Sequence, residues 1–501
     1  MKSLKLFLLG LVGVLLCITA CSKDDDDKSS AKEIKSFQII SLNPVVNGSI
    51  DEKAKTISVT VPYGSDVKAM KTKIIVSDKA TVNPASETVC DFTNAYPFVV
   101  TAEDGTTATY VVTVRTSTNG GEGGEGGNEQ QKVLNGTMSE NTTLKDLGLP
   151  IDYVIDGPFV IDGNACLTIE AGVTIAFTGE GSYIWVGENA GLKVLGEKEK
   201  PVMFTGPINN KNKGSWGYIE FTSKRNDNQL KNVIFENGGS RDAVIYLTNA
   251  KVAIDSCTID GSLGNGIYAY SSEISSFTGN TIKNCDGAPV ESNNLEAYQN
   301  VKEGNVYSNN NENVLKLTNR VAIADMKNKK AVLKHQGIPY LLESPIDVDN
   351  ASELTIEPGV TIQMAADAFI EATGASSIIM EGTAEKPINI TSNSEKVYNR
   401  GIWVQDKCIA SIKNVNISMT YDNQAIYISD DYTDVILENV NISKCRNYGV
   451  YFNNETNSHM KFSQKNVTFS DCADGNIYHN NKGEAVSEFA TSYPIVEQDA
   501  E

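Results

Sequence analysis

The sequence predicts an all-β protein in which a β-sandwich is followed by a right-handed parallel β-helix. Three observations predict it: short strands separated by turn residues near the N-terminus, a glycine-rich linker after them, and a strand pattern that repeats over the rest of the chain. With 501 residues the chain is too long for one ordinary domain. Its hydrophobic content of 40% is sufficient for a packed core.

A basic start followed by an apolar run makes residues 1–20 a predicted secretory signal. The apolar run is too short for a stable membrane span. It ends in Ile-Thr-Ala-Cys, which resembles a bacterial lipobox, and the resemblance implies that Cys21 carries lipid and becomes the mature N-terminus. Residues 22–27, Ser-Lys-Asp-Asp-Asp-Asp, resemble the export signal of Bacteroidota-type surface lipoproteins.

Residues 21–30 are expected to form an acidic tether behind this lipid. Residues 24–28 also match a protease-tag scar, but the lipobox directly upstream favours a native signal. Several acyl chains on one cysteine give stable anchoring without a membrane helix. The resemblance therefore implies a protein anchored to the outer membrane and facing the exterior.

Charge and cysteine usage exclude several classes of function. The formal net charge of −20 argues against nucleic acid as a partner. The nine cysteines include no CxxC pair, so neither a zinc site nor a disulfide framework is predicted. The sequence indicates no metal and no cofactor.

The segment 31–115 is rich in strands. Residues 57–61 alternate strictly between apolar and polar, residues 110–114 are mostly β-branched, and turn residues such as Asp104-Gly105 separate the runs. Residues 101–114 resemble the closing strands of bacterial Ig-like and cadherin-like modules. The resemblance implies an Ig-like β-sandwich that acts as a spacer, and no site is predicted in it.

Residues 116–132 form a glycine- and glutamate-rich linker with nothing to bury, which predicts a domain boundary. The β-helix domain is expected over 133–501.

The β-helix domain contains an internal duplication. The phrase at 167–175, Leu-Thr-Ile-Glu-Ala-Gly-Val-Thr-Ile, returns with small changes at 354–362, and the predicted halves lie near 150–310 and 337–482. A finer period of about 23 to 27 residues within each half corresponds to one coil. Coils of this length, with short strands and Gly- and Asn-rich turns, predict a right-handed parallel β-helix. The regularity fades over 295–336, where the sequence leaves open whether the β-helix continues.

Three asparagines, Asn414, Asn439 and Asn466, each precede a Val-x-(Ile/Phe) triplet. They are predicted to stack as a structural hydrogen-bonded ladder at one turn of successive coils.

The two copies of the Leu-Thr-Ile-Glu phrase and residues 216–219, Trp-Gly-Tyr-Ile, resemble the pectate-lyase-like superfamily of right-handed β-helix proteins. The resemblance covers about two thirds of the chain. It implies the fold but leaves the function open, because the superfamily contains lyases, hydrolases and non-catalytic binders.

Three strand phrases that begin at positions 401, 425 and 449, and so every 24 residues, share a pattern of small, apolar, aromatic, apolar and polar residues. If each phrase lies on one coil, the aromatic residues stack outside about 4.8 Å apart. These residues are Trp403, Tyr427 and Tyr451. Exposed rings at regular spacing suit the apolar faces of sugars, with Gln405 and Asn453 as flanking hydrogen-bonding groups.

The first half echoes this pattern only in part. Tyr246 and Tyr268 match the two tyrosines, but Trp403 has no aromatic counterpart: the matching position is Ile219 or Glu220, depending on the register. The alternative interpretation of the rings is a stacking ladder that stabilises the strands.

The sequence therefore predicts a non-catalytic surface lipoprotein whose β-helix binds a polysaccharide or host glycan. An alternative is a polysaccharide lyase or glycoside hydrolase, for which Asp430, Asp431 and Asp434 are the available acids, with Arg400 or Arg446 nearby. The other motifs of β-helix hydrolases do not accompany this acidic pair, and solvated turn residues explain it more simply. A third alternative is a structural surface protein or adhesin.

Overall fold

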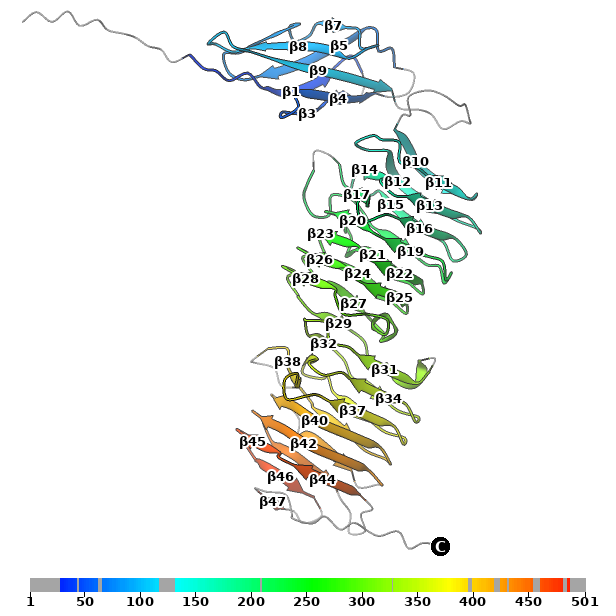
Figure 1. Ribbon diagram of the computed structural model, residues 1–501, viewed down its shortest axis with the longest axis vertical. Helices are drawn as coiled ribbons and strands as arrows, with labels where there is room; N and C mark the ends of the chain where they lie inside the picture. Colours follow the sequence, from blue (N-terminus) through cyan, green and yellow to red (C-terminus); the bar gives the residue numbers. More distant parts are fainter. Residues whose placement is uncertain are drawn as a thin grey trace, which may run out of the picture. The chain divides into compact units, whose positions relative to one another are not determined.

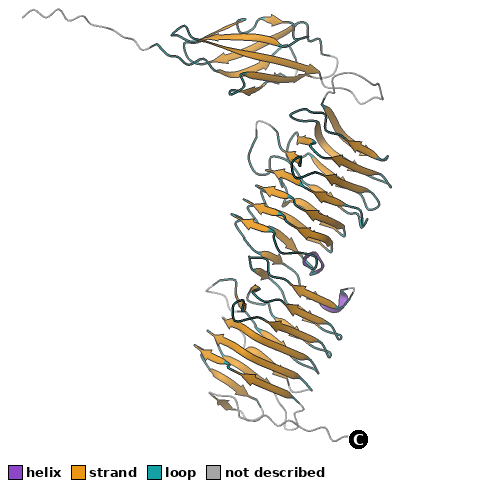
Figure 2. Ribbon diagram, viewed as in Figure 1, coloured by secondary structure: helices purple, strands orange, loops and turns teal. Residues whose placement is uncertain are grey.

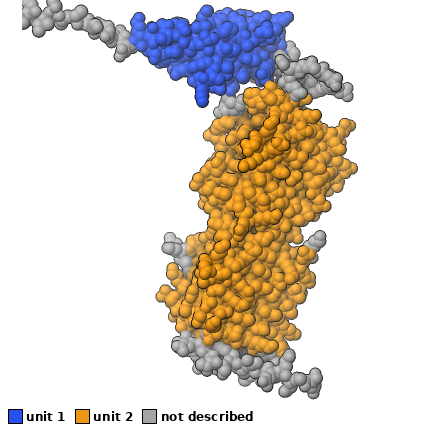
Figure 3. Space-filling view, in the orientation of Figure 1, with its two compact units in different colours: residues 1–116 blue, residues 117–501 orange. Residues whose placement is uncertain are grey.

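The structure, a computed structural model, describes residues 28–42, 45–61, 65–116, 131–207, 210–326, 328–394, 399–418, 424–429, 432–453, 460–480 and the backbone of 484–486. The chain divides into two compact units, Met1–Thr116 and Ser117–Glu501 (Figure 3). The described residues form strands and two 3-10 helices, without an α-helix (Figure 2). In this part of the chain no helix is long and apolar enough to cross a membrane.

Unit 1 is a β-sandwich. Its strands are β1 (Ile34–Ile39), β2 (Val46–Asn47), β3 (Ser49–Asp51), β4 (Thr56–Val61), β5 (Met70–Val76), β6 (Thr81–Asn83), β7 (Val89–Cys90), β8 (Tyr96–Thr101) and β9 (Thr107–Thr116). They form the sheets β2-β1-β5-β7 and β3-β4-β9-β8-β6. Apolar residues of β4 alternate inward, as the sequence predicts, and join a core in which the rings of Phe37 and Phe98 lie 5.6 Å apart.

Unit 2 is a right-handed parallel β-helix of about 13 turns, which confirms the predicted fold class (Figure 1). Its first-half strands are β10 (Lys132–Met138), β11 (Thr142–Leu144), β12 (Tyr153–Ile161), β13 (Cys166–Glu170), β14 (Thr174–Phe177), β15 (Tyr183–Val186), β16 (Gly191–Leu195), β17 (Val202–Thr205), β18 (Ile219–Phe221), β19 (Gln229–Lys231), β20 (Val233–Glu236), β21 (Ala243–Thr248), β22 (Lys251–Asp255), β23 (Thr258–Asp260), β24 (Asn265–Tyr270), β25 (Glu273–Thr278), β26 (Thr281–Lys283) and β27 (Val290–Ser292).

The later elements of unit 2 are η1 (Glu296–Tyr298), β28 (Val306–Ser308), β29 (Leu315–Leu317), β30 (Val321–Ala322), η2 (Ile323–Asp325), β31 (Lys330–Leu333), β32 (Tyr340–Leu342), β33 (Ile346–Val348), β34 (Glu353–Ile356), β35 (Thr361–Met364), β36 (Ile370–Ala372), β37 (Ser377–Glu381), β38 (Ile388–Ser392), β39 (Ile402–Val404), β40 (Ile409–Ser418), β41 (Gln424–Ser429), β42 (Asp434–Ser443), β43 (Tyr448–Asn453), β44 (Lys461–Lys465), β45 (Thr468–Ser470), β46 (Gly475–His479) and β47 (Glu484–Val486).

One row of inward-facing side chains runs through both halves; all are buried except Phe469 at its end, which is half-buried. Each residue pairs in parallel register with the next, from β15 to β45. The row consists of Ile184, Ile219, Ile245, Ile267, Val290, Leu315, Tyr340, Ile362, Ile390, Ile417, Ile442 and Phe469. Stacked coils thus share one core that no single coil could bury alone.

The segment 295–336, which the sequence left open, continues the stack. Strand β28 pairs with β26, and β29 pairs with both β27 and β32. The six-stranded sheet β11-β13-β16-β19-β22-β25 ends before this segment, and the eight-stranded sheet that contains β30, β33, β36, β39, β41, β43, β46 and β47 begins within it.

This junction offsets the duplicated halves by one strand position. The repeated Leu-Thr-Ile-Glu-(Ala/Pro)-Gly-Val-Thr-Ile phrase places β14 and β35 at equivalent points of the sequence. Strand β14 pairs with β12 and β17, whereas β35 pairs through β32, β29 and β27 with the row that starts at β15. Strands that are duplicates in sequence therefore belong to different stacks.

The predicted asparagine ladder is present. The amide nitrogen of Asn439 donates to the amide oxygen of Asn414 at 3.1 Å, and that of Asn466 donates to Asn439 at 3.0 Å. All three residues have a left-handed backbone, with φ between 52° and 54°. The side chains hold the corner between two strands of each coil.

Candidate functional site

The aromatic residues predicted from the sequence lie side by side on the outer face of the eight-stranded sheet. Trp403 on β39 is in register with Tyr427 on β41, and Tyr427 with Tyr451 on β43. Their ring centroids are 5.4 and 5.7 Å apart. Tyr478 on β46 continues the series at 5.0 Å from Tyr451. We call Trp403, Tyr427, Tyr451 and Tyr478 the second-half column; all four side chains are half-buried.

Two further residues join the head of this column. The ring of Phe369 stacks on Trp403, with centroids 5.3 Å apart and planes at 24°. The Arg400 guanidinium lies 4.8 Å from the Phe369 ring and 5.0 Å from the Trp403 ring, and the indole nitrogen of Trp403 donates to the Arg400 carbonyl at 3.0 Å. The sequence missed Phe369 because it precedes β36 and lies outside the register of the aromatic residues.

The two predicted flanking residues make hydrogen bonds within the protein. The amide nitrogen of Gln405 donates to Glu371 at 2.7 Å, and the amide oxygen of Asn453 accepts from Asn480 at 2.8 Å. Glu371 is in register with Trp403, so an acidic residue precedes the column. Burial, and then the nearby Asp347 carboxylate, raise the pKa of Glu371.

The first half carries a separate aromatic series on β15, immediately before β18, and on β21 and β24. We call Tyr183, Tyr218, Tyr246 and Tyr268 the first-half column; consecutive centroids are 4.9, 5.2 and 5.7 Å apart. The exposed Arg241 guanidinium lies 5.3 Å from the Tyr246 ring.

Glu220 occupies the register position next to Tyr246, so the position that corresponds to Trp403 is not aromatic. Tyr218, immediately before β18, supplies the ring instead, and the periodic pattern could not show this. Burial raises the pKa of both Tyr218 and Tyr246.

The structure describes only some of the remaining predicted residues, and those that it describes form no reactive centre. Cys21, Asp430 and Asp431 lie outside the described residues, and the half-buried Asp434 begins β42. Among the residues described, no group of three or more His, Cys, Asp and Glu side chains is arranged to hold a metal ion.

Family comparisons agree with this architecture. Residues 34–114 match the family "SGBP, N-terminal". Residues 136–243 and 325–404 match "Pectate-lyase like beta helix domain", and residues 205–330 match "Right handed beta helix region". No curated protein matches the chain.

Solved structures show limited similarity. A protein from Bacteroides thetaiotaomicron, provisionally assigned as a glycoside hydrolase, is 25% identical over 19% of this chain and 28% of its own, with a TM-score of 0.17. A DUF4623 family protein from Bacteroides eggerthii is 23% identical over 18% of this chain and 22% of its own, with a TM-score of 0.16. The catalytic domain of a GH87 α-1,3-glucanase in complex with nigerose is 10% identical over 93% of this chain and 87% of its own, with a TM-score of 0.18.

The chain thus spans about a quarter of the length of the first two structures, and TM-scores this low carry no functional argument. The strand pattern, the parallel register and the family matches lead to one assignment. The chain joins an SGBP N-terminal domain to a right-handed β-helix of the pectate-lyase-like kind.

Proposed function

We propose that this chain is a non-catalytic cell-surface protein that binds a glycan or host surface polymer along the second-half column. The SGBP name denotes cell-surface glycan-binding proteins, which supports the class of ligand. The observation that carries the proposal is the continuous row of half-buried rings at Trp403, Tyr427, Tyr451 and Tyr478.

The geometry of the column suits a linear ligand. Rings in register on successive parallel strands offer a strip of apolar surface along the axis of the β-helix. A pyranose ring has an apolar face of CH groups and an edge of hydroxyl groups, so it stacks on a ring and hydrogen-bonds at its rim. Gln405 and Asn453 flank the strip and are the proposed hydrogen-bonding residues.

The proposed cellular setting follows from the N-terminus. Cys21 is the proposed lipidation site, and the lipid places the protein on the outer membrane with its β-helix facing the exterior. The β-sandwich of unit 1 then acts as a spacer between the lipid and the β-helix.

Glycan-array binding of the full chain, followed by calorimetry on the best ligand, tests the column. If a sugar ring covers about 50 Å² of each aromatic face, the loss of one ring costs about 1 kcal/mol, or about fivefold in Kd. Replacing Trp403, Tyr427 and Tyr451 together by alanine should therefore weaken binding by about a hundredfold. The Tyr427→Phe/Tyr451→Phe variant keeps the rings and should retain affinity.

Tyr270→Ala is the matched control, because this tyrosine is 45% exposed and belongs to neither column. It should bind as the unmodified chain does. A glycan affinity that is unchanged in the triple alanine variant would show that the column is a stabilising ladder rather than a binding surface.

A further inference from the structure

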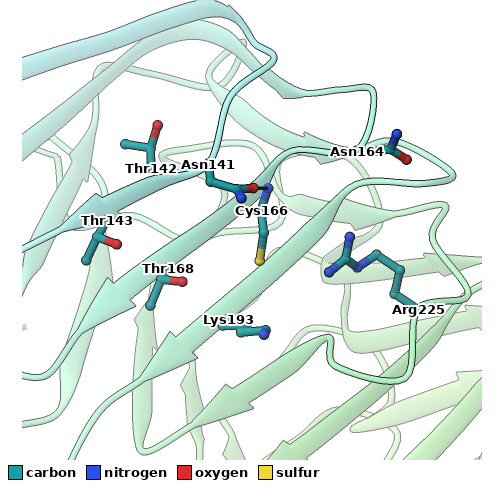
Figure 4. A pocket seen from close by; sticks show the side chains of 8 residues that line it. All are labelled: Asn141, Thr142, Thr143, Asn164, Cys166, Thr168, Lys193 and Arg225. Atoms are coloured by element: carbon teal, nitrogen blue, oxygen red, sulfur yellow. Dashed lines mark hydrogen bonds between the residues drawn. The ribbon is translucent and has the colours of Figure 1, made fainter.

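A polar pocket opens on the outer face of the six-stranded sheet in the first turns of the β-helix (Figure 4). Its volume is about 440 Å³, which is within the range of small-ligand sites. It lies on other strands than either aromatic column. Hydroxyl, amide, thiol and cationic groups line it, from Asn141, Thr142, Thr143, Asn164, Cys166, Thr168, Lys193 and Arg225.

The regular stacking of the strands creates one wall of the pocket. Thr143, Thr168 and Lys193 occupy adjacent register positions on β11, β13 and β16, so their side chains emerge from the same face of the sheet. The side-chain oxygen of Asn141 accepts a hydrogen bond from the backbone nitrogen of Cys166 at 2.8 Å and fixes the upper edge.

A rigid turn before β19 supplies the opposite wall. Asn228 is 1% exposed, its amide nitrogen donates to the carbonyls of Ser223, Arg225 and Lys251, and its amide oxygen accepts from the backbone of Leu192. These bonds tie the turn to both neighbouring coils. Arg225 is therefore held in place before any ligand arrives, which lowers the entropic cost of binding.

Two cations in this pocket share one carboxylate. Asp227 accepts two hydrogen bonds of 2.8 Å from Arg225 and one ion pair of 2.8 Å from Lys193. The hydrogen bonds from Arg225 and then Lys193 hold the pKa of Asp227 well below its ordinary range. The bond to Asp227 raises the pKa of Lys193, so all three groups stay charged and the cluster keeps one net positive charge.

This positive cluster stands out in a chain with a formal net charge of −20. The Lys193 ammonium has three donors and Asp227 engages one, while Thr143 and Thr168 add hydroxyl donors on the same face. Preorganised cationic and hydroxyl donors around a cavity of this size favour an oxyanion such as a carboxylate or a sulfate.

We propose that this pocket binds the carboxylate or sulfate group of an acidic glycan, with Lys193 and Arg225 as the charged contacts. The choice of a glycan as the ligand rests on the function proposed above, but the residues of the pocket are separate from the aromatic column.

Calorimetry on the full chain tests the proposal with two matched pairs of probes. The first pair is a hyaluronan hexasaccharide, which carries carboxylates, and its methyl ester, which is neutral. The second pair is a sulfated galactan hexasaccharide and its desulfated, neutral form. The charged member of at least one pair should bind about tenfold or more tightly than its neutral partner, since a hydrogen bond to a charged group is at stake.

Three variants assign the effect to the pocket. Lys193→Met should weaken binding of the charged probe about tenfold. Asp227→Asn should strengthen it, because the competing carboxylate is removed; a merely structural role of the cluster predicts weakening instead. Lys413→Met is the control, since Lys413 is about as exposed as Lys193 and pairs with Glu381 at 2.7 Å, but belongs to β40 of the 24-stranded sheet rather than to the sheet that carries the pocket.

The outcomes separate this pocket from the column. Equal binding of charged and neutral probes, no binding of either acid, or an unaltered affinity in Lys193→Met would each overturn the pocket. If the triple alanine variant at Trp403, Tyr427 and Tyr451 keeps the charged probe while Lys193→Met loses it, the pocket stands and the proposed role of the column fails. The reverse pattern would support the proposed role of the column and overturn that of the pocket.

Discussion

Replacing Asn439 by alanine perturbs the asparagine ladder at its central member. Asn439 donates to Asn414 at 3.1 Å and accepts from Asn466 at 3.0 Å, so the substitution removes two hydrogen bonds. A typical bond contributes about 1 kcal/mol net. The backbone at position 439 has φ of 54°, where an alanine costs about 1 kcal/mol more. The expected loss in the free energy of unfolding is therefore about 3 kcal/mol.

Asn439→Gly separates the two contributions. Glycine loses the same hydrogen bonds but adopts the left-handed backbone without the steric cost, so it should lose about 2 kcal/mol. Ser463→Ala, an exposed substitution on neighbouring β44, should leave stability within about 0.5 kcal/mol of the unmodified chain.

Urea unfolding followed by tryptophan fluorescence measures these changes. All three tryptophans, Trp185, Trp216 and Trp403, lie in unit 2, so the signal reports on the β-helix alone. The reasoning is refuted if Asn439→Ala is as stable as the Ser463→Ala control. It is also refuted if glycine at position 439 destabilises more than alanine, since the left-handed backbone would then play no part.

Three further predictions concern packing, pH and turnover. A methyl group added at Gly238 would lie 2.5 Å from the buried Trp216 ring. Gly238→Ala should therefore lower the free energy of unfolding in urea by about 1 to 3 kcal/mol. Gly179→Ala is the control and should change it little, because the space around Gly179 is open. Burial raises the pKa of Tyr298, Tyr307 and Tyr340. Their contribution to stability is therefore complete below the tyrosine pKa of the unfolded chain, about 10, and is lost as the pH rises above that value. Tyrosinate absorbance should show that these three rings ionise only when the β-helix unfolds. Incubation with acidic and neutral polysaccharides should release no reducing ends or unsaturated products, and turnover that is lost in Asp434→Asn would overturn the non-catalytic proposal.

The sequence predicted the local register well, because parallel stacking repeats one strand pattern at a fixed period. The spacing of Trp403, Tyr427 and Tyr451 was sufficient to place them in adjacent register positions, and the asparagine ladder followed in the same way. Burial of alternate apolar residues leaves little freedom in such a stack, since a shift by one residue would expose the core.

Other features depend on segments that do not repeat. The offset between the halves arises at 295–336, where the repeat pattern of the sequence fades, so the sequence could not show that Tyr246 and Tyr427 lie in different sheets. Phe369 and Tyr218 lie next to strands rather than within their pattern. The polar pocket depends on the turn that carries Arg225 and Asp227, and its closure by contacts between coils is visible only in three dimensions.

The offset also determines whether a single polymer could reach both aromatic columns. The first-half column lies on strands that continue into the second part of β40 and β42, whereas the second-half column lies on β39, β41 and β43, the next stack around the coil. A stiff, straight polymer that runs along one column does not turn onto the other face. A flexible polymer can turn from one column to the other, and its contact with the second column would then occur at a high effective concentration. If the first-half column also bound a polymer, the duplicated β-helix would be bivalent for flexible chains and monovalent for rigid ones.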